Sequence, residues 1–166
     1  WSSLLFVCFL HHSGKLVPTR IIAIPHGFTL ISNPRPVSPS STSSVIGGGT
    51  AFLIRDPCTL LSSPTPIFKS FELSSVTLKL KHSKLTVYNI YRPPSSSAKS
   101  RASATFSQFL EDFQTLVSSA STTPHEFLIT GDFNIHVDDL TDSNATQFMS
   151  LLDHANLIQH VSFPTH

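Results

Sequence analysis

Polar residue types that can do hydrolytic chemistry follow one apolar run directly. The run 127–130 leads into Gly131, Asp132, Phe133 and Asn134. Asp132 can orient a water molecule or take its proton, and the Asn134 amide can donate a hydrogen bond to a phosphate oxygen without adding charge. Because side chains alternate along a strand, we expect Asp132 and Asn134 to point to the same side, and Gly131 to let a substrate or a neighbouring backbone approach. The same residue types also form ordinary strand-to-loop turns, so both interpretations stay open on these residues alone.

The elements before this segment are predicted as strands and one helix. The strands are rich in β-branched, apolar and aromatic residues and cover residues 48–55, 71–81 and 85–91. His82 and Ser83 would close a hairpin between the last two. Apolar residues at helical spacing then predict an amphipathic helix over 106–117, with Glu111 and Asp112 on its solvent side.

The elements around and after the polar segment are a strand and a second helix. The strand covers 126–130, and the helix carries Phe148 and Leu152 on its apolar face. Asn144 is the expected N-cap and Asn156 the expected C-terminal stop, and residues 157–161 can begin another strand. This order of elements predicts a layered α/β domain with helices packed on a sheet.

Several motifs resemble a known superfamily. GDFN at 131–134 and YNIYRPP at 88–94 resemble the endonuclease/exonuclease/phosphatase superfamily. The apurinic-endonuclease-like domain of LINE-type non-LTR retrotransposons is the closer resemblance, carried by GGGTAFLIR at 47–55, GDFNIHVDD at 131–139 and QFMSLLDHANLIQHVSFPTH at 147–166. The resemblance covers residues 18–166 and leaves 1–17 unassigned. It implies a four-layer α/β sandwich, with two packed β-sheets flanked by helices, truncated at both ends.

The resemblance also implies roles for matching residues. Asp132 would activate or position the attacking water, Asn134 would contact the scissile phosphate, and Tyr91 would donate a hydrogen bond to that phosphate. Arg92 and His136 are weaker candidates for contacts with phosphate or DNA. The implied reaction is Mg²⁺-assisted hydrolysis of a phosphodiester in duplex DNA. It leaves a nick whose 3′-hydroxyl primes reverse transcription, and a reverse transcriptase domain is expected downstream in an intact element.

Two blocks of the family pattern are not found in this sequence. The family carries an Asn and a metal-binding Glu in its N-terminal strands and an Asp-His pair near its C-terminal end. Neither Glu72 nor Glu111 stands at the position of that Glu, and no metal ligand is identifiable. Mg²⁺ is usually held by one or two carboxylates plus waters. We therefore expect weak metal binding and little or no nuclease activity from this chain.

The weaker candidate residues can also be interpreted as ordinary surface residues without a binding role. Three basic residues on a Ser-rich stretch either contact DNA phosphates, which would make binding salt-dependent, or simply solubilise a loop: Arg92, Lys99 and Arg101. His136, Asp138 and Asp139 follow GDFN and form either the rim of a site or a solvated acidic loop.

Composition narrows the class of protein. With 13% charged and 40% hydrophobic residues, the chain is not a disordered polyelectrolyte. All 11 Lys and Arg lie within residues 15–101, and eight of the 10 acidic residues lie from 111 onward. This split suits a basic face for phosphates beside an acidic site, or two solvated faces that happen to differ.

Two cysteines are too few for a disulfide framework. The apolar run 4–10 is too short to span a membrane and lacks a basic flank, so we expect a nuclear or cytoplasmic protein that is not secreted.

Two other functions remain open from the sequence. One is a phosphatase or phosphodiesterase of the same superfamily with a non-nucleic substrate, against which the segment QHVSFPTH argues. The other is an inactive remnant or a fragment that binds nucleic acid weakly.

Overall fold

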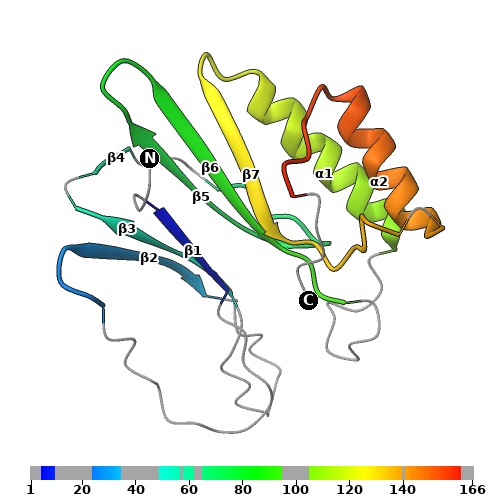
Figure 1. The fold of residues 1–166 in the computed structure, drawn as a ribbon, viewed down its shortest axis with the longest axis horizontal. Coiled ribbons are helices and arrows are strands. Elements are labelled where there is room, and N and C mark those ends of the chain that lie inside the picture. The colour runs from blue at the N-terminus through cyan, green and yellow to red at the C-terminus, as the bar shows by residue number, and fades with distance from the viewer. Residues whose placement is uncertain are drawn as a thin grey trace, which may run out of the picture. The chain divides into compact units, whose positions relative to one another are not determined.

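The computed structural model describes residues 5–9, 24–34, 49–56, 58–61, 65–94, 105–139 and 141–161. The chain forms two compact units (Figure 1). The first unit consists of Trp1–Phe68, Glu72–Tyr91 and His125–Asp132, and the second of Lys69–Phe71, Arg92–Pro124 and Phe133–His166. Lys99 and Arg101 lie outside the described residues.

A sheet of four strands forms one layer of the first unit, in the order β4-β5-β6-β7. Its strands are β4 (Thr59–Leu61), β5 (Glu72–Lys79), β6 (Lys84–Tyr91) and β7 (Glu126–Asp132). The hairpin predicted between β5 and β6 is confirmed, with the Leu80 N–H donating to the Ser83 carbonyl at 2.9 Å. β6 and β7 are parallel, as expected for neighbouring strands joined by a long crossover rather than by a tight turn.

A sheet of three antiparallel strands forms the other layer, in the order β1-β3-β2. Its strands are β1 (Leu5–Phe9), β3 (Gly49–Arg55) and β2 (Phe28–Pro34). Only β3 was expected from the sequence. β1 lies inside the segment 1–17 that the sequence left unassigned, and its five residues pair with β3 along their whole length.

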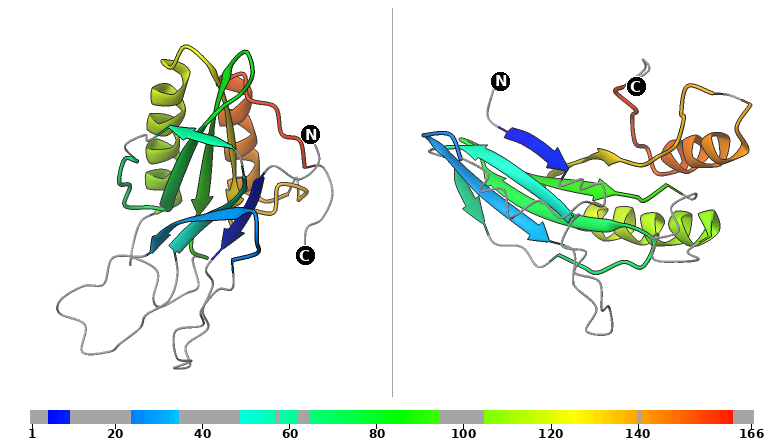
Figure 2. Two further views of the ribbon diagram at one scale, coloured as in Figure 1. Left: turned by 90° about the vertical axis from the view of Figure 1, so that its left-hand side faces the viewer. Right: turned by 90° about the horizontal axis from the view of Figure 1, so that it is seen from below.

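The two sheets pack face to face (Figure 2), and apolar side chains from both sheets form a common core. The buried residues of this core are Phe52, Ile54, Val76, Leu78 and Val87. Side-chain amides also join the layers: the Asn33 amide donates to the Leu73 carbonyl at 2.8 Å, and the Asn89 amide to the Ala51 carbonyl at 3.4 Å. The predicted pair of packed sheets is therefore confirmed.

Two helices lie side by side in the second unit, α1 (Phe106–Ser121) and α2 (Ser143–His154) (Figures 1 and 2). The Phe148 ring of α2 lies 5.8 Å from that of Phe109 and 5.2 Å from that of Phe113 in α1, measured between centroids. The buried residues of α1 recur at the predicted helical spacing: Phe109, Phe113, Leu116, Val117 and Ala120. Neither helix is long and apolar enough to cross a membrane, and no other helix among the described residues is.

The structure corrects the predicted N-cap of α2 and the strand predicted after the helix. The N-cap is Asp142, whose carboxylate accepts from the Asn144 N–H at 2.8 Å, and not Asn144 itself. Asn156 follows the helix with a φ of 53°, a left-handed conformation that ends helices, so this predicted stop is confirmed. Residues 157–161 form no strand, and most of their side chains are exposed.

Asp112 on α1 is partly buried, although the sequence placed it on the solvent side of the helix. Its carboxylate accepts from the Ser70 hydroxyl at 2.7 Å and from the Ser70 N–H at 3.2 Å. The Gln108 amide also donates to this carboxylate, at 3.1 Å. A distant loop residue thus supplies hydrogen bonds that helical periodicity cannot show.

Candidate active site

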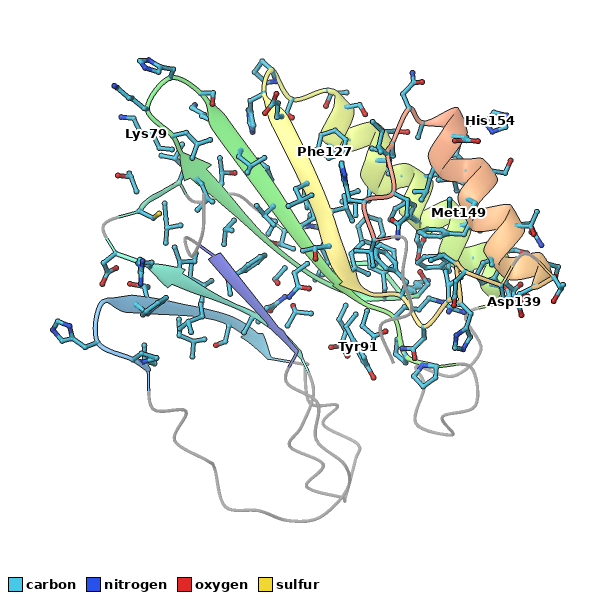
Figure 3. The ribbon with its side chains drawn as sticks, in the orientation of Figure 1. Lys79, Tyr91, Phe127, Asp139, Met149 and His154 are labelled. Atoms are coloured by element: carbon cyan, nitrogen blue, oxygen red, sulfur yellow. The ribbon has the colours of Figure 1, made fainter. Side chains whose placement is uncertain are left out.

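Tyr91 and Asp132 are the last residues of two neighbouring strands, β6 and β7, and they are direct partners in the parallel register (Figure 3 labels Tyr91). Both side chains are partly buried. Register partners on neighbouring strands project from the same face of a sheet. The structure therefore brings together two residues to which the family resemblance assigns roles.

Glu72 extends this row to a third strand. It is the first residue of β5 and pairs with Tyr91 in the antiparallel register, so Glu72, Tyr91 and Asp132 occupy consecutive positions across the sheet. Sequence reasoning had compared Glu72 only with the position of the family's metal-binding Glu. The register of the hairpin was the signal that could have placed it beside Tyr91.

The interior of the sheet sandwich becomes polar toward this row. Along β6, Val87, Asn89 and Tyr91 share one face because side chains alternate, and Val87 belongs to the core between the sheets. Asn89 is fully buried, and Ser74, its register partner on β5, is 4% exposed. Within the described part of the chain, Asn89 Oδ1 and Ser74 Oγ have no hydrogen-bond partner. Burying polar atoms without hydrogen-bond partners costs stability, so core packing alone does not explain the polar residues in this layer.

Gly131 lets the end of β7 lie close against β6. Its φ is +148°, and a β-carbon at this position would lie 2.0 Å from the Ile90 carbonyl oxygen. The predicted close approach of a neighbouring backbone at Gly131 is therefore confirmed. No larger residue fits here without displacing the backbone beside the Tyr91–Asp132 pair.

In the second unit, Arg92 and Asn134 bind one another's backbone. Arg92 Nη1 donates to the carbonyls of Phe133 and Asn134, at 2.9 and 3.1 Å. Asn134 Nδ2 donates to the Arg92 carbonyl at 2.6 Å. Asn134 has a φ of 48°, so the strand alternation that ends at Asp132 does not continue to Asn134. Alternation therefore gives no support for the expectation that both side chains point to one side, which stays a prediction.

The Arg92 guanidinium also lies over two aromatic rings of α1. Its central carbon is 5.2 Å from the Phe106 centroid and 5.0 Å from the Phe109 centroid. Burial lowers the pKa of the Arg92 side chain from its ordinary value. An arginine still carries its charge at neutral pH, and the flat faces of the rings favour that charge.

His136 and Asp139 lie on the loop that leads to α2. The His136 carbonyl accepts from the Asp139 N–H at 3.0 Å, and the His136 side chain is exposed. The Asp139 carboxylate accepts from the Thr141 hydroxyl at 2.7 Å and from the Thr141 N–H at 2.9 Å. These hydrogen bonds, with a smaller contribution from the charge of His136, hold the pKa of Asp139 below its ordinary value.

A metal centre was tested against the side chains that the structure describes. No three His, Cys, Asp or Glu side chains among them are gathered where they could hold one ion. Glu72 and Asp132 lie in the same row but are separated by the Tyr91 position. Among the described residues, no cluster of three such ligands therefore marks a metal centre.

The sequence and the fold are each similar to known proteins. Residues 85–166 match the family described as endonuclease-reverse transcriptase. The endonuclease domain of TRAS1, a telomere-specific non-LTR retrotransposon, has a similar fold, with a TM-score of 0.54 and 15% identity over 84% of this chain and 58% of that domain. A humanised TDP2 from D. rerio is similar with a TM-score of 0.52 and 13% identity, over 86% of this chain and 52% of that protein. No curated protein matches in sequence.

The chain thus spans little more than half the length of the two solved structures that it resembles. The matched segment 85–166 contains β7, most of β6 and both helices, and with them Tyr91, Arg92, Asp132 and Asn134. Two packed sheets and two helices confirm the predicted α/β class. The predicted resemblance is confirmed as well: residues 85–166 match the endonuclease-reverse transcriptase family, and the fold is similar to that of the TRAS1 endonuclease domain.

Proposed function

We propose that this chain carries the phosphate-binding end of a site that hydrolyses phosphodiesters in duplex DNA, as part of a retrotransposon endonuclease acting in the nucleus. The observation that carries the proposal is the register pair of Tyr91 and Asp132 at the ends of β6 and β7. A carboxylate beside a phenol at the end of adjacent parallel strands can serve both the attacking water and the phosphate.

The proposed roles follow from what each group can donate or accept. The Asp132 carboxylate orients the attacking water and takes up its proton. The Tyr91 hydroxyl donates a hydrogen bond to a phosphate oxygen, where negative charge increases during the reaction. We assign the Asn134 amide, which also donates to the Arg92 carbonyl, to the phosphate as a hydrogen-bond donor.

The product would be a nick that leaves a 3′-hydroxyl for a reverse transcriptase elsewhere in the element. The family resemblance implies Mg²⁺ for this reaction. Because the metal-binding Glu of the family pattern is not identifiable in the sequence, we expect the 166-residue chain by itself to nick DNA slowly or not at all. Phosphate binding does not need a complete catalytic site, so DNA binding is the more sensitive readout.

The first experiment measures binding of a fluorescent DNA duplex by anisotropy over a range of salt concentrations. We expect weak binding that falls as salt rises, with a dissociation constant of about 10⁻⁴–10⁻⁶ M. Tyr91→Phe and Asn134→Ala should weaken it, and Asp153→Asn on the exposed face of α2 should not. Binding that ignores Tyr91 and Asn134 would contradict the proposed site.

The second experiment follows nicking of supercoiled plasmid in Mg²⁺, with Asp132→Ala compared against Asp153→Asn. We expect little nicking from the parent chain. Any nicking by this site should be lost in Asp132→Ala and kept in Asp153→Asn. Strong nicking that depends on Asp132 would overturn the expected low activity while supporting the assigned chemistry. Cleavage of a simple phosphodiester without plasmid nicking would favour a different substrate. The absence of both cleavage and DNA binding would favour an inactive remnant.

A further inference from the structure

We propose that Arg92 is a positioning residue, which fixes the turn at Phe133 and Asn134 so that the Asn134 amide is presented to the phosphate. The role given to Asn134 rests on the proposed function, whereas the contacts that hold the turn are independent of it. The sequence also offers Arg92 as a direct contact to DNA phosphate, and the two roles lead to different measurements.

The contacts between Arg92 and the turn are reciprocal. One guanidinium nitrogen binds two successive carbonyls, of Phe133 and Asn134, at 2.9 and 3.1 Å. The Asn134 side chain returns a hydrogen bond of 2.6 Å to the Arg92 carbonyl. Three hydrogen bonds therefore connect residues that lie 41 or 42 positions apart in the sequence.

The conformation of the turn explains why it needs such support. Asn134 has a φ of 48°, a left-handed conformation that is uncommon for residues other than glycine. Asn tolerates it better than most residues, but the open conformations of an unrestrained loop compete with it. Both carbonyls that Arg92 binds belong to this turn, so releasing them removes one restraint on the Asn134 backbone.

Two phenylalanine side chains of α1 hold the Arg92 guanidinium. It lies over the rings of Phe106 and Phe109, and Phe109 is 1% exposed. The Phe133 ring is anchored in the same aromatic cluster, with centroids 6.0 Å from Phe113 and 5.4 Å from Phe148. The turn is thus fixed twice, through its carbonyls by Arg92 and through its aromatic side chain by the helices.

Arginine suits this arrangement better than lysine does. Its planar group stacks on rings with its face while it donates from its edge, and a lysine ammonium lacks that plane. A phosphate contact is less demanding, because lysine also provides the charge. Arg92→Lys therefore separates the two roles, with Arg92→Gln as the variant without charge.

The test measures the carbonyl ¹³C resonances of Phe133 and Asn134 by NMR in the full 166-residue chain. In Arg92→Lys and in Arg92→Gln we expect both to shift toward the values of carbonyls without a hydrogen bond. The matched control is Arg55→Lys in the first unit. Arg55 also lies over an aromatic ring, that of Phe28 at 5.6 Å, and its substitution should leave both resonances unchanged. Unchanged resonances in both Arg92 variants would overturn the proposal.

DNA binding provides the second readout. If Arg92 positions Asn134, Arg92→Lys lowers affinity about tenfold, the effect of losing one or two hydrogen bonds, with the salt dependence unchanged. If Arg92 contacts a phosphate, Arg92→Lys keeps the DNA affinity of the parent chain, and Arg92→Gln reduces the salt slope by about one. This result, together with unchanged carbonyl resonances of Phe133 and Asn134, would overturn the positioning role. Absence of DNA binding in the parent chain would count against the proposed function alone, because the carbonyl resonances still decide the role of Arg92.

A variant that fails to fold is recognised by its amide spectrum. Asn134→Gly is then measured in place of the Arg92 variant, since glycine accepts a positive φ and removes the side chain that donates to the Arg92 carbonyl. The carbonyl resonance of Arg92 should move in this variant, while those of Phe133 and residue 134 keep their bonded values. A resonance of Arg92 that does not move would contradict the reciprocal contact.

Discussion

Gly131 and Ile90 approach so closely that a β-carbon on Gly131 would lie 2.0 Å from the Ile90 carbonyl oxygen and 2.8 Å from the Ile90 carbonyl carbon. These two residues are register partners immediately before the pair Tyr91 and Asp132. The glycine therefore sets the spacing of the two strands at the point where they deliver the candidate catalytic groups.

Gly131→Ala should destabilise the protein strongly, by about 3 kcal/mol or more, because both an unfavourable φ and a backbone collision result. Gly27→Ala is the matched control, since Gly27 has a φ of +80° but nothing lies within 4 Å of an added β-carbon. Its cost should be about 1–2 kcal/mol, that of the conformation alone. Urea unfolding of the two variants measures the difference, and equal losses of stability would show that the close approach to Ile90 is unimportant.

Ser70→Ala should reduce the free energy of unfolding by about 1–2 kcal/mol. Ser70 is 7% exposed, and its hydroxyl donates to the Asp112 carboxylate at 2.7 Å. Ser119→Ala, at an exposed position of α1, is the control and should be nearly neutral. A double-mutant cycle with Asp112→Asn isolates the pair; a coupling energy near zero would mean that the hydrogen bond contributes nothing to stability.

Thr141→Val should raise the pKa of Asp139 toward its ordinary value, because the Thr141 hydroxyl is the largest cause that lowers it. The folded loop is therefore favoured while Asp139 is ionised, and this contribution is lost as the pH falls through the lowered pKa. An NMR titration of the Asp139 carboxyl carbon gives the pKa directly. Thr146→Val is the control, since the Thr146 hydroxyl donates to the Asp142 carbonyl and not to a carboxylate. An Asp139 pKa that is the same in both variants would contradict the assigned cause.

The longest elements could be predicted from the sequence because their patterns are local. The apolar spacing of α1, the strands β3, β5, β6 and β7 and the second helix all follow from residues near one another in the chain. β1, β2 and β4 were missed because they are short or carry no clear alternation, and their main support is pairing with a distant strand. The N-cap of α2 was misplaced by two residues, since Asp142 and Asn144 are both good capping residues and only the backbone conformation selects between them.

The sequence by itself determined the chemistry that is available: Asp132 and Asn134 after an apolar run, Tyr91 at the end of a strand, and the glycine between Thr130 and Asp132. Only the tertiary structure decided which of these groups are neighbours. The pairing of Glu72 with Tyr91 and of Tyr91 with Asp132 depends on the strand register. The two carbonyls bound by Arg92 belong to residues 41 and 42 positions away. The physical reason is that residue types and spacing are local properties, whereas register and hydrogen-bond partners arise when distant segments pack against one another.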